Sequence, residues 1–73
     1  MIKAAREIRR EIKANATRLI VAADWHLKHI EADNATTEQK EYAFQMLEKI
    51  RLMSLGRLRV DMDVCYDIDK EYR

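Results

Sequence analysis

The sequence predicts an all-α fold in which two long helices pack against each other as an antiparallel hairpin. Three observations support this prediction. Helix-favouring residues dominate a chain with one glycine and no proline, a single turn signal lies near the middle, and apolar residues repeat at helical spacing on both sides of it. At 73 residues the chain is expected to form one domain, residues 1–73.

The first helix is expected over residues 2–32. Its apolar residues recur at steps of four, three and four, which places them on one helix face. This stripe consists of Met1, Ala5, Ile8, Ile12, Ala16, Leu19, Ala23, Leu27 and Ile30. A turn over residues 33–36 follows, because Asn34 tolerates the left-handed conformation in which many helices end.

The second helix is expected over residues 37–70. Thr36 and Gln39 have the spacing of a capping box at its start. Its apolar stripe consists of Ala43, Leu47, Ile50, Ser54, Leu58, Met62 and Cys65. A register that pairs Ala23 with Leu47 also pairs Ile12 with Leu58. It lays residues 1–18, with six cations and two carboxylates, beside residues 58–73, with five carboxylates and three cations.

An α+β alternative stays open for the C-terminal part of the chain. Apolar and polar residues alternate from Leu58 to Val64, and alternation of period two is typical of a half-buried strand. Gly56 could end the second helix just before this segment. The aspartates and the lack of a second strand favour helix, and the alternative is a C-terminal strand over residues 57–69.

Few residues in the sequence are candidates for metal binding or catalysis. His26 and His29 have a helical spacing that can hold a metal, but no cysteine lies near them, so we interpret both as partly exposed surface residues. Cys65 falls on the core stripe and is expected to be a small buried hydrophobe. An acidic cluster lacks the glycine and the closing glutamate of a calcium loop; it consists of Asp61, Asp63, Asp67 and Asp69. We therefore expect no metal, no cofactor and no enzymatic activity.

The expected location is the cytoplasm. The chain has one cysteine and no secretory signal, and both features are typical of a reducing compartment. Its longest apolar run is too short to cross a bilayer, so no membrane contact is expected.

The apolar residues exceed what a two-helix hairpin can bury, and such a surplus usually marks an interface. The residues predicted to contact a partner are Val21, Trp25, Met46, Met53 and Val60. We expect both a homodimer, in which two hairpins form a four-helix bundle, and a larger protein target.

A basic stripe runs along the first helix and consists of Lys3, Arg6, Arg10 and Lys13. The preferred interpretation is a small non-enzymatic protein–protein interaction module, a regulator or inhibitor that occupies a partner surface. Short, self-contained chains of this kind are common among phage and mobile-element regulators, which is an association with size. The alternatives are a helical bundle that binds RNA or DNA through the basic stripe, and a structural subunit of a larger assembly.

Overall fold

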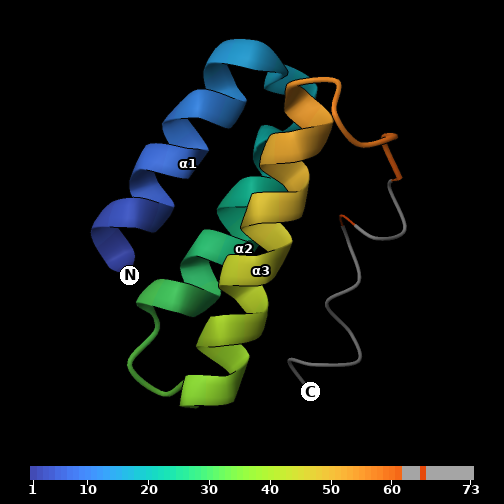
Figure 1. Ribbon diagram of the computed structural model, residues 1–73. Coiled ribbons are helices and arrows are strands. Elements are labelled where there is room, and N and C mark those ends of the chain that lie inside the picture. Colours follow the sequence, from blue (N-terminus) through green and yellow to red (C-terminus); the bar gives the residue numbers. More distant parts are fainter. Residues whose placement is uncertain (62–64, 66–73) are drawn as a thin grey trace.

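The computed structural model describes residues 1–61 and 65 and shows an all-α arrangement (Figure 1). Helix α1 spans Ile2–Asn15, a short 3₁₀ turn η1 spans Thr17–Leu19, α2 spans Ile20–Glu31, and α3 spans Thr37–Ser54. The chain rises along α1, descends along α2 and rises again along α3, so each helix runs antiparallel to the one before it (Figure 1). The predicted all-α class is confirmed for the described residues.

The prediction of one continuous helix over residues 2–32 is wrong, because the chain leaves the helical conformation at Ala16. Ala16 has φ −152° and ψ 82°. The two polar residues beside it bond to the preceding turn: the Asn15 side-chain amide donates to the Glu11 carbonyl at 2.8 Å and the Thr17 hydroxyl to the Lys13 carbonyl at 3.3 Å. Side chains of this kind compete with helix continuation. Helix α1 therefore folds back against both α2 and α3.

Helix α3 begins where the sequence predicts. The Thr36 hydroxyl accepts from the Gln39 backbone N–H at 3.1 Å, and the Gln39 side chain accepts from the Thr36 N–H at 2.9 Å. This reciprocal pair is the predicted capping box, and it satisfies two N–H groups that a helix start otherwise leaves without partners.

Helix α3 ends at Ser54, and the prediction of a helix continuing to residue 70 is wrong at that point. Gly56 has φ +72°, a left-handed conformation that glycine adopts without strain. The Gly56 N–H donates to the Met53 carbonyl at 3.2 Å, and the Arg57 N–H donates to the Leu52 carbonyl at 2.9 Å. These two bonds form a Schellman motif, which satisfies the last carbonyls of the helix.

The structure describes only part of residues 57–69, for which a strand is the alternative to a helix. Residues 57–61 form no strand, and the Cys65 N–H donates to the Asp61 carbonyl at 3.0 Å, which is the spacing of a helical turn. The remainder of the expected strand or helix, residues 62–64 and 66–70, lies outside the described residues. Leu58 is 40% exposed, so it is not the buried partner of Ile12 that the predicted register required.

The core lies where the three helices meet. Helix α1 contributes Ala5 and Ile12, and η1 contributes Leu19. From α2 come Ala22, Ala23, His26 and Ile30, and from α3 come Ala43, Met46, Leu47, Ile50 and Met53. Cys65 completes this set and is fully buried. Alanine on α2 lets its neighbours approach closely, while larger side chains on the other helices fill the remaining space.

Candidate functional site

A line of exposed side chains, which we call the outer stripe, begins in η1 and continues along the outward face of α2. It consists of Arg18, Val21, Trp25 and Lys28, at steps of three, four and three residues. Val21 is 63% exposed and Trp25 is 42% exposed, although both are large and apolar. They lie opposite the buried face of the same helix. The outer stripe therefore offers an apolar pair with a cation at each end.

The Trp25 indole packs against the His29 ring, which a hydrogen bond to the Trp25 backbone holds in place. The His29 ring donates from Nδ1 to the Trp25 carbonyl at 2.8 Å, and the two ring centroids lie 5.5 Å apart at a tilt of 39°. A side chain that is ordered before binding loses less entropy when it becomes part of an interface. The indole is thus both accessible and partly preorganised.

Three residues predicted to contact a partner do not form an exposed row. Met46 and Met53 are buried, with exposed fractions of 3% and 5%, and Val60 is partly buried against the core. The Cys65 thiol donates to the Met53 sulfur at 3.4 Å, so Cys65 contacts that methionine. The interpretation of these residues as free contact area is therefore wrong for this chain.

The basic stripe on α1 is exposed along its whole length, at Lys3, Arg6, Arg10 and Lys13. It lies on the side of α1 that faces α2. A shallow groove between the two helices is lined by Arg6, Arg9, Arg10, Lys13, Leu27 and Glu31. The groove thus brings together Arg6, Arg10 and Lys13 from the predicted stripe and adds Arg9, which is partly buried, whereas Lys3 is exposed but does not line it.

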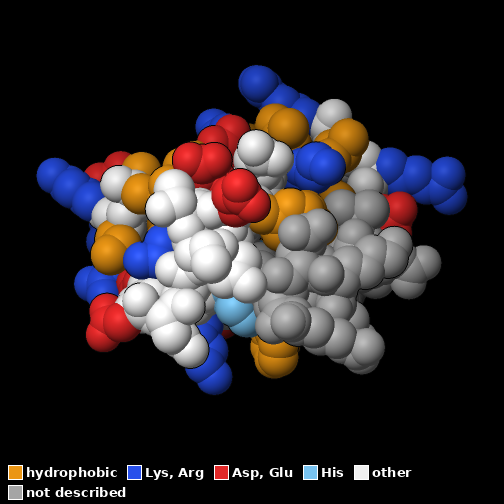
Figure 2. Space-filling view, turned by 90° about the horizontal axis from the view of Figure 1, so that it is seen from below, with side chains coloured by type: hydrophobic (Ala, Val, Ile, Leu, Met, Phe, Trp, Pro, Cys, Tyr) orange, Lys and Arg blue, Asp and Glu red, His pale blue; other side chains and the backbone are white. Residues whose placement is uncertain are grey.

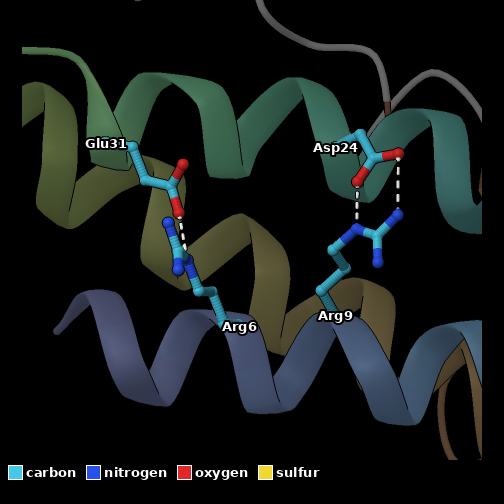
Figure 3. Close-up of polar contacts among 4 residues, drawn as sticks. All are labelled: Arg6, Arg9, Asp24 and Glu31. Atoms are coloured by element: carbon cyan, nitrogen blue, oxygen red, sulfur yellow. Dashed lines mark hydrogen bonds and ion pairs between the residues drawn. The ribbon is translucent and has the colours of Figure 1, made fainter.

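Two of these arginines form ion pairs with carboxylates on α2 (Figure 3). Arg6 donates from Nε to Glu31 at 2.6 Å, and Arg9 reaches both carboxylate oxygens of Asp24. The bonds to Glu31 and Asp24 raise the pKa of the Arg6 and Arg9 guanidinium groups, so both stay charged. These pairs were missed at the sequence level, because a continuous first helix never brings residues 6–9 beside residues 24–31.

The end of the molecule that carries the α2–α3 turn also carries the start of α1, where Met1 and Ile2 are 56% and 46% exposed (Figure 1). Figure 2 looks onto this end, where Lys and Arg side chains project outward and hydrophobic side chains form only small separate areas.

The two histidines have different environments. His26 is fully buried, and its Nε2 donates to the Cys65 carbonyl at 2.9 Å, so its interpretation as a surface residue is wrong. His29 is partly exposed, as expected. Within residues 1–61 and 65, no three His, Cys, Asp or Glu side chains gather in a way that could hold a metal.

The remaining sequence predictions concern the acidic cluster, the cysteine and the membrane. Asp61 is exposed, while Asp63, Asp67 and Asp69 lie outside the described residues. Cys65 is buried, as predicted, and its burial, together with the nearby Asp61 carboxylate, raises the pKa of the thiol. No helix in the described part of the chain combines the length and the apolar content needed to span a bilayer.

Comparison of this chain with protein-family models, with curated proteins and with solved structures finds no match.

Proposed function

We propose that this protein is a small non-enzymatic interaction module that binds an acidic protein partner through the outer stripe and regulates or inhibits it by covering its surface. One observation carries the proposal: Val21 and Trp25 are exposed between Arg18 and Lys28, while the opposite face of α2 is buried. Exposed apolar residues bordered by charge are typical of interfaces.

Trp25 is the expected anchor. Tryptophan is among the residues most often found at the energetic centre of an interface, where its truncation to alanine costs about 2 kcal/mol or more. This corresponds to a loss of affinity of about 30-fold. Val21, one helical turn away, supplies adjoining apolar contact area.

Charge favours a foreign partner over a second copy of the chain. A symmetric antiparallel pairing of two α2 helices through this stripe would place Val21 opposite Trp25, and Arg18 opposite Lys28 of the other copy. Like charges placed opposite each other are destabilising. A partner with carboxylates at these two places, around an apolar centre, makes attractive contacts instead. The expected four-helix dimer also loses support, because Met46 and Met53 are already buried.

The test uses Trp25 as its own reporter, because it is the only tryptophan in the chain. Peptides selected on the full-length protein from a random display library should combine acidic and apolar residues. Their binding should shift the Trp25 emission to shorter wavelength, as the indole leaves water. Trp25→Ala should weaken binding by about 30-fold, and Arg18→Glu with Lys28→Glu should abolish the preference for acidic peptides.

The matched control is Leu58→Ala, which removes another exposed apolar side chain outside the stripe and should leave affinity unchanged. Peptides that bind Trp25→Ala as tightly as the parent protein would refute the proposal. So would a homodimer that light scattering detects and that Arg18→Glu strengthens, because the second copy would then be the occupant.

A further inference from the structure

The groove between α1 and α2 is not used by the outer stripe. It encloses about 490 Å³ and is lined by Arg6, Arg9, Arg10, Lys13, Leu27 and Glu31. Four cations and one carboxylate line the groove, and with Asp24, which bonds to Arg9, these groups have a net charge of +2. The chain as a whole has a net charge of only +1, so positive charge is concentrated here.

The four cations of the groove differ in whether they form ion pairs with neighbouring residues. Arg6 and Arg9 are fixed by Glu31 and Asp24 on α2 (Figure 3). Arg6 bonds to Glu31 through Nε, one of the five N–H donors of a guanidinium group, which leaves its terminal nitrogens to contact a ligand. Arg10 and Lys13 are exposed and form no ion pair with any residue in 1–61 or 65. The groove thus combines preorganised arginines with unpaired cations.

The spacing of these cations fits a row of phosphates. Arg6 and Lys13 are seven residues apart on α1, which is about 10 Å along a helix axis. Three of these cations can each contact a phosphate: Arg6 through its terminal nitrogens, and Arg10 and Lys13, which have no ion-pair partner among residues 1–61 and 65.

We propose that this groove binds the phosphate backbone of a nucleic-acid duplex without reading its bases. Among the residues that the structure describes, no aromatic side chain lines the groove, so these residues offer none of the stacking on which proteins that bind single strands depend. Arginine and lysine contacts to phosphate position a protein on nucleic acid but carry no sequence information. The groove shares no residue with the outer stripe. An experiment that refutes binding at the groove would therefore leave the function proposed for the outer stripe unaffected.

The salt dependence of binding provides the first test. Fluorescence anisotropy would measure the Kd of the full-length protein for a short labelled duplex. If three phosphates are neutralised, raising the salt concentration from about 50 to about 200 mM should weaken binding by about 40-fold. Arg10→Ala with Lys13→Ala removes two of the three contacts, so the same rise in salt should then weaken binding by only about 3- to 4-fold.

A matched control removes the same charge elsewhere. Lys49 and Arg57 are exposed on α3 and in the turn after it, and neither lines the groove. Lys49→Ala with Arg57→Ala should therefore retain the affinity and the salt dependence of the parent protein, and so should Trp25→Ala. Circular dichroism would establish that all variants keep the parent helicity.

Several results would overturn the proposal. They are the absence of duplex binding at low salt, a Kd that does not respond to salt, and equal binding by the groove variant and its control. Tighter binding of the single strand than of the duplex would show that stacking, not backbone geometry, governs recognition. Displacement of the duplex by an equal charge concentration of polyglutamate would show that the groove does not select phosphate.

Discussion

The hydrogen bond from His26 to the Cys65 carbonyl holds the chain beyond α3 against α2, and removing it should loosen that contact. His26 and Cys65 are both fully buried, and the His26 Nε2 lies 2.9 Å from the Cys65 carbonyl oxygen. His26→Ala leaves this carbonyl without its donor in a dry environment, at a free-energy cost of about 1–3 kcal/mol. The equilibrium constant for local opening around Cys65 should therefore rise about 5- to 150-fold.

Thiol labelling measures this opening directly, because Cys65 is the only cysteine in the chain. With a chromogenic disulfide reagent in excess, the labelling rate of a buried thiol follows the population of the open state. His26→Ala should accelerate labelling about 5- to 150-fold. This increase should be larger than the loss of global stability in the same variant would produce by itself.

Ile12→Val is the matched control. It removes one methyl group from a fully buried residue on α1 and should lower the free energy of unfolding by about 0.5–1.5 kcal/mol. The labelling rate should hardly change in this variant, because local opening does not require the whole fold to unfold. If both variants raise the labelling rate in proportion to their loss of global stability, then Cys65 becomes accessible only through global unfolding, and our reasoning is refuted.

Three further predictions concern stability in urea. Thr36→Ala should lower the free energy of unfolding by about 1 kcal/mol, because it removes the capping box, whereas Thr37→Ala, one residue later, should have a much smaller effect. Gly56→Ala should cost about 1–2 kcal/mol through its φ of +72° alone, since no atom lies within 4 Å of the added methyl group; an unchanged midpoint would contradict the left-handed helix end. Since the pKa of Cys65 is raised in the folded chain, the unfolded chain loses the thiol proton first. The protonated thiol therefore makes its full contribution to stability below pH 9.0, and the free energy of unfolding should decrease as the pH rises above this value. The decrease should be smaller in Cys65→Ala, which has no thiol at this position.

Local signals predicted the features of this fold that depend on neighbouring residues. The capping box at Thr36 is set by residues within a few positions and is confirmed. Gly56 supports a helix end only in the α+β alternative, and the preferred prediction, a helix to residue 70, is wrong. The break at Ala16 was missed because alanine is itself the strongest helix former, so the apolar stripe runs through it without interruption. Only the polar residues on either side of Ala16 hint at the break, and tertiary packing completes it.

The two errors in the helix bounds, at Ala16 and at Ser54, also explain the misplaced partner residues. Two helices cannot cover Met46 and Met53, so these side chains were predicted to be exposed. Three helical segments and Cys65 bury them. Val21 and Trp25 remain exposed because they lie on the outward face of α2 in either arrangement. The basic stripe was found from its spacing, whereas its groove required α1 to lie beside α2.

The uneven anchoring of α1 has a consequence for how the molecule opens. In the described residues α1 contributes only Ala5 and Ile12 to the fully buried set, and it is tied to its neighbours by ion pairs to Asp24, Glu31 and Arg51. Detachment of α1 would remove Ala5, Ile12 and the partly buried Ile8 from the core that the three helices share. Salt screens the exposed ion pairs but not these apolar contacts, so a rise in ionic strength should modestly increase the rate at which the α1 amide protons exchange with solvent.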